Sequence, residues 1–447
     1  MKRFIELLRD QGELLTVSHP LDPRHEISTV LSELGKNEHP AILVEKVKGY
    51  SLPVIGNLLG TRKRISMALG INPDHLSEEA IPKIEDKRSP VLISDLPSKD
   101  RITKKKGIEL LKILPVLTHY SKDSGPFITS GITSAKDPLD GTTGRGLHRM
   151  EVRGKNLLGI SLMTPPLSEI YARCKKENRK MEIATVIGVH PAILVASVLR
   201  VPAGTDKLSV AGGLMGQPVP VVTAKTVELN IPAHAEITLE GIIDPRGKEK
   251  DGVLGESSGY YMSLPNSPTI HITAITYRKS ACFHAILPWG LEVDHLLSFI
   301  HGIDFIPKMR KEIPSLRRVH FVSRTFGSHV VMSLDSDNKG EIRRALTLAL
   351  SFPMIKKAIA VGSDVDPEDI HEVEWSLATR FQADRDMIVL TGIRGSAIDP
   401  SSRERVFTTK VGMDATRPKK EGFEKVEVPE DVKRRLAPLL NKFRRSI

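Results

Sequence analysis

The feature that most limits the fold of this chain is a central run of short strand-like segments, from about residue 116 to residue 300. Apolar and β-branched runs bounded by Pro or Gly recur there, at 150–163, 219–222, 236–243 and 269–277. Helical spacing is clear only over 169–180, with a second possible start at Pro191. Many short strands with few helices predict a β-barrel or sandwich at the centre of the chain.

Strand and helix patterns alternate on both sides of this centre, so the chain is expected to belong to the mixed α/β (α+β) class. Its 447 residues exceed one ordinary core. We expect an α/β domain over 1–115, the β-rich domain over 116–300 and a second α/β domain over 301–447. The last of these ends in a predicted helix over 430–447 with an apolar stripe, which should dock on its own domain or on a neighbouring subunit: Val432, Leu436, Leu439, Leu440 and Phe443.

The net charge of +11 indicates affinity for anions, and nucleic acid, phosphorylated metabolites or an anionic cofactor would all suit it. Aromatic residues make up only 4% and do not interleave with the basic runs, so no nucleic-acid partner is expected. Two cysteines cannot build a disulfide framework, which favours a reducing cytoplasm. No apolar run reaches the ~18 residues of a membrane span, so no membrane partner is expected either.

Two carboxylates, Glu292 and Asp294, stand where a strand-like region turns helical. Acids two residues apart on an extended backbone project to the same side, and burial there would leave one of them a proton donor near neutral pH. Alternatively the two acids simply begin a helix at Asp294, where carboxylates suit the free backbone N–H groups. The local sequence leaves both interpretations open.

A second acidic pattern lies in the segment 236–244, EITLEGIID. Period-two alternation puts Glu236, Glu240 and Asp244 on one face of a strand, opposite the core. Such a face is either solvated, which is the commoner case, or a cation site. Gly144 and Gly146 form a GxG without the third glycine or the preceding strand of a dinucleotide fingerprint. No P-loop, CxxC or nucleophile elbow accompanies it.

Several segments together resemble the UbiD family of decarboxylases, in the family's order and over nearly the whole chain: FIELLRDQGELLTV, GLHRMEVRGKN, IGVHPAILVAS, IPAHAEITLEGIIDP, GESSGYY, ITYR, VGSDVDPEDIHEVEWSLATRF and KVGMDAT. The resemblance implies an α/β outer domain, a central split β-barrel that binds prenylated FMN, and a C-terminal oligomerisation helix. In that family the modified flavin serves as electron sink, and the protein supplies placement and a proton.

The resemblance also implies roles for individual residues. Arg149, in GLHRM, matches the arginine that clamps the substrate carboxylate, a task suited to the planar guanidinium. Asp294, in GLEVD, matches the acid that protonates the carbon after carbon dioxide leaves. Glu292 is then a neighbour that holds Arg149 or tunes that proton. Arg149 also belongs to the implied cofactor-binding set, with Gly144, Leu147, His148, Ser161, Met163 and, near the flavin phosphate, Lys410.

Asp244, in EGIIDP, matches a ligand of the family's divalent metal, usually manganese, and K⁺ is a further candidate ion. Two departures bear on this metal. The family often has a metal-binding asparagine where this chain has Gly144, and a histidine where it has Pro165 or Pro166. Either fewer protein groups hold the metal or the flavin phosphate is held differently.

The activity that the resemblance implies is removal, or addition, of a carboxylate on an unsaturated or aromatic carbon. The relatively short basic chain looks like an archaeal branch that converts trans-anhydromevalonate 5-phosphate to isopentenyl phosphate in isoprenoid synthesis. Decarboxylation of an aromatic acid of the 4-hydroxybenzoate type and a non-catalytic flavin-binding scaffold are the alternatives. The implied partners are a small carboxylic acid, phosphorylated in the first case, a flavin prenyltransferase that supplies the cofactor, and further copies of the chain.

Overall fold

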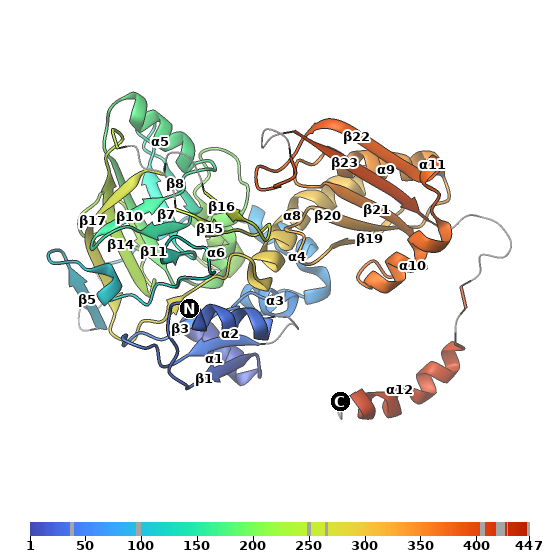
Figure 1. The fold of residues 1–447 in the computed structure, drawn as a ribbon, viewed down its shortest axis with the longest axis horizontal. Helices are drawn as coiled ribbons and strands as arrows, with labels where there is room; N and C mark the ends of the chain where they lie inside the picture. The colour runs from blue at the N-terminus through green and yellow to red at the C-terminus, as the bar shows by residue number, and fades with distance from the viewer. Residues whose placement is uncertain are drawn as a thin grey trace.

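A computed structural model describes residues 1–35, 40–94, 100–247, 252–263, 267–402, 407–416, 425–426 and 428–444. Figure 1 shows a strand-rich body on the left, with the N-terminal helices below it and a second α/β body on the right. This mixture of helices and sheets confirms the predicted fold class. None of the described helices has the length and apolar character needed to cross a lipid bilayer.

The N-terminal part is built around a small sheet of strand order β1-β2-β3-β18. Its fourth strand, β18 (Phe283–His284), arrives from far along the chain and pairs in parallel with β3. The sheet therefore ties the start of the chain to the segment just before residue 290. The other elements are α1 (Lys2–Asp10), β1 (Leu14–Val17), α2 (Glu26–Gly35), β2 (Ala41–Val44), β3 (Val54–Gly56), α3 (Arg62–Leu69), η1 (Pro73–His75) and α4 (Leu76–Glu85).

The central part is a nine-stranded antiparallel sheet of order β6-β9-β10-β17-β14-β11-β7-β8, with β5 on the free part of β17. The sheet curls around apolar side chains, as an open barrel does, and confirms the predicted split barrel (Figure 1). Its strands are β5 (Arg101–Lys104), β6 (Phe127–Ile128), β7 (Ile132–Lys136), β8 (Thr143–Leu147), β9 (Met150–Val152), β10 (Leu157–Ile160), β11 (Met181–Ile187), β14 (Ile237–Ile243) and β17 (Thr269–Arg278).

Shorter elements surround this sheet. Helix α5 (Leu167–Lys176) lies within the predicted helical segment apart from its first two residues. A three-stranded sheet pairs β4 with β12 and β13, and a two-stranded hairpin pairs β15 with β16. The remaining bounds are η3 (Leu110–Lys112), β4 (Val91–Leu92), α6 (Pro191–Val198), α7 (Lys207–Met215), β12 (Pro220–Thr223), β13 (Asn230–Pro232), β15 (Leu254–Gly255) and β16 (Tyr261–Met262).

The structure confirms one local prediction and corrects another. Strands β9 and β10 lie in the strand-like segment predicted at 150–163 and pair as a hairpin, with Leu158 opposite Val152. Of the two alternatives for the acidic face, the solvated one is wrong for Glu236 and Glu240, because both residues are about 1% exposed. Glu240 accepts hydrogen bonds from the backbone N–H groups of Lys225 and Thr226, at 2.9 and 2.5 Å. A neighbouring loop therefore covers the face that alternation alone assigned to solvent.

The C-terminal part has a five-stranded sheet of order β19-β20-β21-β23-β22, whose middle strands are parallel. Helix α9 packs against β21 and β23 through an apolar core that includes Leu346 and Leu350. The elements are β19 (Leu316–Phe321), β20 (His329–Leu334), α9 (Lys339–Ser351), β21 (Lys357–Gly362), α10 (Ile370–Arg380), α11 (Ala383–Asp386), β22 (Met387–Arg394) and β23 (Phe407–Ala415).

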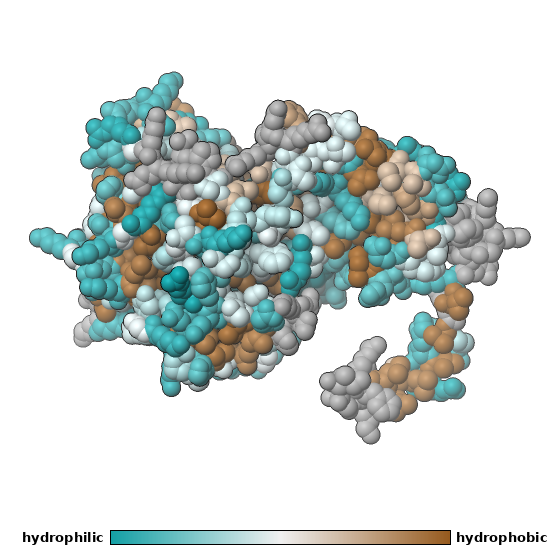
Figure 2. All heavy atoms as spheres, viewed as in Figure 1, coloured by the Kyte–Doolittle hydropathy of each residue, from teal (hydrophilic) through white to brown (hydrophobic). Residues whose placement is uncertain are grey.

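Two helices connect or extend these parts. Helix α8 (Leu291–Glu312) runs across the predicted boundary at residue 300 and contacts α4, α6, α9 and β19. Helix α12 (Glu430–Arg444) lies away from the body, at the lower right of Figure 1. Its predicted apolar stripe includes the exposed side chains of Leu436, Leu439 and Leu440, and hydrophobic atoms run along the helix in Figure 2. The side chain of Phe443 lies outside the described residues.

Candidate active site

Arg149 stands in the short connection between β8 and β9, on the central sheet. One of its terminal nitrogens, Nη1, donates a hydrogen bond to Glu256 Oε1. The other, Nη2, lies 3.3 Å from the backbone oxygen of Met262. The side chains of Arg149 and Glu256 are 9% and 21% exposed, so the ion pair is largely shielded from water. A shielded pair of this kind holds its two members in fixed positions.

Glu256 belongs to the glycine-rich turn between β15 and β16. The backbone N–H of Glu256 donates to Tyr260 O, and Gly259 N donates to Glu256 O, both at 2.9 Å. Gly259 has φ +80°, a left-handed conformation that favours glycine, and the Trp289 ring packs where a side chain would stand. Sequence reasoning placed Glu256 in a landmark of the family but did not identify it as the partner of Arg149.

Glu292 and Asp294 lie in the first turn of α8, which begins at Leu291 after the N-cap residue Gly290. The interpretation that the two acids begin a helix is therefore the better one, although the helix starts three residues before Asp294. The prediction that both carboxylates project to one side is wrong, because residues two apart in a helix differ by about 200° around its axis.

The two carboxylates meet different partners. Glu292 is fully buried, and its Oε1 accepts a hydrogen bond from Leu59 N at 3.1 Å. His284 Nε2 lies 3.2 Å from the same oxygen. Glu292 therefore faces the N-terminal sheet, and Arg149 is held by Glu256 instead.

Asp294 lines a small pocket that opens to the surface. Burial raises the pKa of the Asp294 carboxyl, and the nearby Ser323 hydroxyl and Arg324 N–H only partly offset this effect. Within the described part of the chain, neither carboxylate oxygen makes a hydrogen bond of ordinary geometry. An acid with a raised pKa beside a pocket can keep its proton for delivery to a ligand.

Three parts of the chain build the pocket. The β15–β16 turn contributes Ser257, and the β19–β20 loop contributes Arg324 and Phe326. The approach to α8 and its first turns contribute the rest: Pro288, Trp289, Gly290, Val293, Asp294 and Leu297. Ser257, which lines this pocket with Asp294, directly follows Glu256, the partner of Arg149. No sequence pattern pointed to Arg324, which lies in the β19–β20 loop of the C-terminal part.

Two residues of the expected cofactor set, His148 and Ser161, are linked by hydrogen bonds to each other and to the backbone of Arg149. His148 Nδ1 lies 2.8 Å from Ser161 O, and Ser161 N donates to Arg149 O at 3.2 Å. A carbonyl can only accept, so His148 carries its proton on Nδ1, and burial lowers its pKa to about 4. Leu147 is the last residue of β8, and the side chain of Met163, just beyond β10, is exposed.

Gly144 is placed differently from the rest of that set. A Cβ at this position would lie 2.6 Å from Ile170 Cδ1 and 2.9 Å from Pro166 Cγ. Helix α5 and the turn before it therefore fill the space beside Gly144. Close packing accounts for the glycine here without a ligand.

Asp244 and Lys410 each have partners of their own. Asp244 follows β14 and pairs with Arg246, at 2.9 Å from Oδ1 to Nε. Lys410 is fully buried in β23, where Nζ donates to the backbone oxygens of Leu350 at 2.9 Å and Phe352 at 2.7 Å. Among the residues that the structure describes, no three His, Cys, Asp or Glu side chains gather as metal ligands would.

Comparison with protein families matches three successive segments of the chain. Residues 5–84 match the 3-octaprenyl-4-hydroxybenzoate carboxy-lyase N-terminal domain of the UbiD family. Residues 92–291 match the Rift-related domain of the same family, and residues 294–415 match its C-terminal domain.

Two curated relatives carry the same name, anhydromevalonate phosphate decarboxylase. The protein of Methanosarcina mazei is 31% identical over 96% of this chain and 99% of its own length. That of Methanothermobacter thermautotrophicus is 30% identical over 94% of this chain and 97% of its own length.

Solved structures agree with these matches. The UbiD-class enzyme HmfF from Pelotomaculum thermopropionicum, in complex with FMN, superposes with a TM-score of 0.93 at 32% identity, over 98% of this chain and 99% of that one. An evolved dimeric form of HmfF, in complex with prFMN, gives 0.88 at 31% identity, with the same coverage. This chain belongs to the UbiD family of decarboxylases.

Proposed function

We propose that this chain is a decarboxylase of a phosphorylated α,β-unsaturated acid that uses prenylated FMN. The best candidate reaction converts trans-anhydromevalonate 5-phosphate to isopentenyl phosphate. The observation that carries the proposal is that the β15–β16 turn holds Arg149 through Glu256 and, through the next residue, Ser257, lines the pocket of the buried acid Asp294. The name shared by the two curated relatives supports the choice of substrate.

Prenylated FMN fits the polar atoms that the central domain leaves without partners. Within the described residues, His148 Nε2, Ser258 Oγ and the Asp294 carboxylate are buried and lack hydrogen bonds. Buried polar atoms usually have partners, so such a group favours a polar ligand beside it. When bound, the prenylated flavin supplies the electron sink that decarboxylation of an unreactive alkene acid requires.

The metal fits less well. Asp244 is paired with Arg246, and the described residues hold no cluster of three ligating side chains. No step of the reaction is therefore assigned to manganese or potassium.

The protein's own residues would act in sequence. Arg149 would bind the substrate carboxylate through its planar guanidinium and orient it. As the bond between that carboxylate and the α-carbon breaks, carbon dioxide leaves. Protonated Asp294 would then donate its proton to the same carbon, forming the new C–H bond. The raised pKa of Asp294 supports this role, because the proton donor must be protonated at the start.

The position of Arg324 indicates that the substrate carries a second anionic group. It lines the same pocket as Asp294 and comes from the β19–β20 loop, in a left-handed backbone conformation with φ 62°. A guanidinium beside the reacting end of the pocket suits a phosphate group. We therefore assign to Arg324 the recognition of the substrate phosphate.

The test uses enzyme produced together with a flavin prenyltransferase. Carbon dioxide release should be fastest from trans-anhydromevalonate 5-phosphate and much slower from the dephosphorylated acid or from 4-hydroxybenzoate. Arg324→Met should raise KM for the phosphorylated acid by about tenfold or more, as expected for loss of a charge-assisted hydrogen bond. Arg317→Met is the matched control, because Arg317 pairs with Asp335 on the surface. Preference for 4-hydroxybenzoate would contradict the proposal and favour an aromatic acid decarboxylase.

We also propose that α12 forms a contact between copies of the chain. Its exposed leucines lie on one side of a helix that stands away from its own body (Figure 2). An apolar stripe of this kind is stable in water only when another surface covers it.

A further inference from the structure

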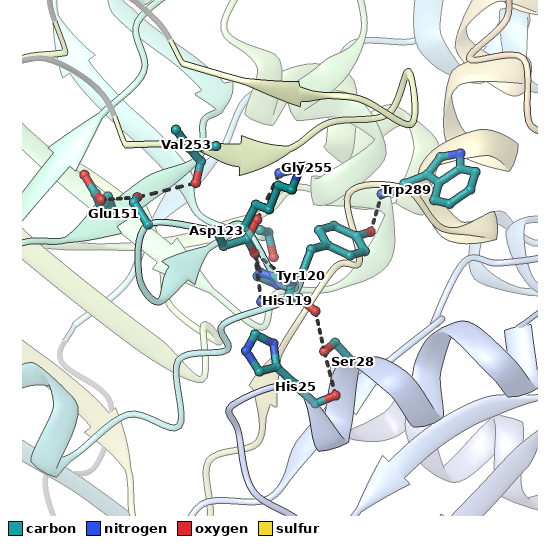
Figure 3. A network of polar contacts seen from close by, with 12 residues as sticks. His25, Ser28, His119, Tyr120, Asp123, Glu151, Val253, Gly255 and Trp289 are labelled. Carbon is teal, nitrogen blue, oxygen red and sulfur yellow. Dashed lines mark hydrogen bonds and ion pairs between the residues drawn. The ribbon is translucent and has the colours of Figure 1, made fainter.

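Tyr120 lies between the two turns that carry the candidate catalytic groups. It belongs to the segment that follows η3 and precedes β6. Figure 3 shows its ring beside Gly255 and its hydroxyl directed toward the backbone of Trp289. Gly255 directly precedes Glu256, and Trp289 lies five residues before Asp294. The Tyr120 side chain thus contacts both the residue before Glu256 and the segment that leads to Asp294.

The first contact is a close fit between the Tyr120 ring and Gly255. A Cβ at Gly255 would lie 2.8 Å from Tyr120 Cε2, and closer still to Cδ2. The ring therefore occupies the space of a side chain at this position. Because Gly255 ends β15, the ring sets the position from which the chain turns into Glu256.

The second contact is a hydrogen bond. Trp289 N donates to the Tyr120 hydroxyl at 2.9 Å, across 169 residues of sequence. Burial raises the pKa of the Tyr120 hydroxyl above its usual value, so it stays neutral. Trp289 lines the pocket beside Asp294, and its ring packs on Gly259 of the Glu256 turn.

Asp123 anchors Tyr120 itself. Its Oδ2 accepts hydrogen bonds from His119 N at 2.9 Å and Tyr120 N at 2.8 Å, and its Oδ1 accepts one from Gly255 N at 3.0 Å. The Ser28 hydroxyl donates to His119 O at 2.8 Å and fastens the same segment to α2 (Figure 3). Asp123 and Ser28 thus fix the backbone segment that carries the Tyr120 ring.

We infer that Tyr120 is a positioning residue that fixes the Arg149–Glu256 pair relative to Asp294. The phenol touches neither reacting group. It acts through Gly255 on one side and through Trp289 on the other. The inference rests on the proposed function for its kinetic consequence, but the bracing of Trp289 is testable without any reaction.

Tyr120→Phe keeps the ring on Gly255 and removes only the acceptor for Trp289 N–H. We expect kcat to fall about tenfold, in line with one hydrogen bond that aligns reacting groups, while KM stays within about twofold. Flavin content and the melting temperature should remain close to those of the parent enzyme. The alkaline limb of the kcat profile should move to lower pH, because looser packing around Asp294 reduces the burial that raises its pKa.

Tyr261→Phe is the matched control. Tyr261 lies on β16 of the same hairpin, and its hydroxyl contacts Ser121 Oγ at 3.4 Å and Lys122 N at 3.3 Å instead of Trp289. The control should leave kcat and the pH profile unchanged. An equal loss of kcat in both variants would overturn the inference.

A second measurement needs no substrate or flavin. The chain has two tryptophans, so Trp375→Phe leaves Trp289 as the only tryptophan, and its emission is read with excitation that tyrosine does not absorb. In that background Tyr120→Phe should raise the acrylamide quenching constant of Trp289 by about twofold, because the hydrogen bond that holds its turn is gone. Unchanged quenching would overturn the inference. If Tyr120→Phe increases the quenching but the parent chain shows no decarboxylase activity, the positioning role of Tyr120 stands and the proposed function is contradicted.

Gly255→Ala disrupts the contact between Gly255 and the Tyr120 ring, and it is the alternative variant if Tyr120→Phe folds poorly. The added methyl group cannot fit beside the Tyr120 ring, so the ring must move. We expect a loss of kcat and an increase in Trp289 quenching at least as large as for Tyr120→Phe. Parental kcat and quenching in Gly255→Ala would overturn the inference.

Discussion

Leu59 N donates a hydrogen bond to Glu292 Oε1 at 3.1 Å, which joins the N-terminal domain to the first turn of α8. The contact turns Glu292 away from the pocket that its neighbour Asp294 lines. Two acids that lie two residues apart in the sequence therefore have different surroundings. Glu292 bonds the N-terminal domain to the first turn of α8, and Asp294 lines the pocket in which we propose the reaction.

Replacing Glu292 should thus affect stability. Glu292→Ala leaves Leu59 N buried without an acceptor, and the free energy of unfolding should fall by about 1–3 kcal/mol. Glu292→Gln keeps an oxygen at the same place and should lose less. Urea unfolding followed by circular dichroism measures both. Equal unfolding midpoints for Glu292→Ala and the parent chain would show that the bond contributes nothing.

Replacing Lys410 should likewise affect stability and leave flavin binding unchanged. Lys410→Met removes the donor to two buried backbone oxygens in the C-terminal core, so the free energy of unfolding should fall by about 1–3 kcal/mol. Flavin content should not change. Lys308→Met, at an exposed position on α8, is the control. Loss of flavin with unchanged stability would restore the phosphate-binding role that the family resemblance implies.

Helix α12 should determine the number of subunits. The double change Leu436→Glu and Leu440→Glu places charges on the exposed apolar stripe, and the oligomer should dissociate. Arg434→Glu, on the opposite face of the helix, should leave it intact. Light scattering after size-exclusion chromatography gives the mass directly. The same mass for all three chains would exclude α12 from the contact.

The pH dependence of stability tests the burial of Asp294. Its folded-state pKa is raised, so the carboxyl stabilises the fold only at low pH, and this contribution is lost as the pH rises through the folded-state pKa. Asn cannot titrate. The unfolding free energy of Asp294→Asn relative to the parent chain should therefore increase from about pH 4, near the unfolded-state pKa, towards neutral pH. A difference that is independent of pH would contradict the raised pKa.

Local signals predicted much of the fold. The strand-like pattern at 150–163 was enough to locate β9 and β10, and helical spacing over 169–180 was enough to locate α5. The pairing of β18 with β3 was not predictable, because it joins segments that lie more than two hundred residues apart. The burial of Glu240 likewise depends on a loop, at Lys225 and Thr226, that no period-two pattern contains.

The site was predictable only in part. Family landmarks pointed to Arg149 and Asp294, but the partner of Arg149 lies 107 residues away in sequence, at Glu256. The first turn of α8 reversed the expected relation of Glu292 to Asp294, since extended and helical backbones point alternate residues differently. Contacts such as Trp289 with Tyr120 arise from the packing of three separate segments, which spacing alone does not encode.

The central claim is that Asp294 donates the proton in a decarboxylation whose substrate carboxylate is bound by Arg149. Its most direct test is carbon dioxide release from trans-anhydromevalonate 5-phosphate by Asp294→Asn enzyme that carries prenylated FMN. We predict a fall in kcat of about 10²–10⁴-fold, the range for loss of a general acid, with parental flavin content. Parental turnover by Asp294→Asn, at equal flavin content, would contradict the claim.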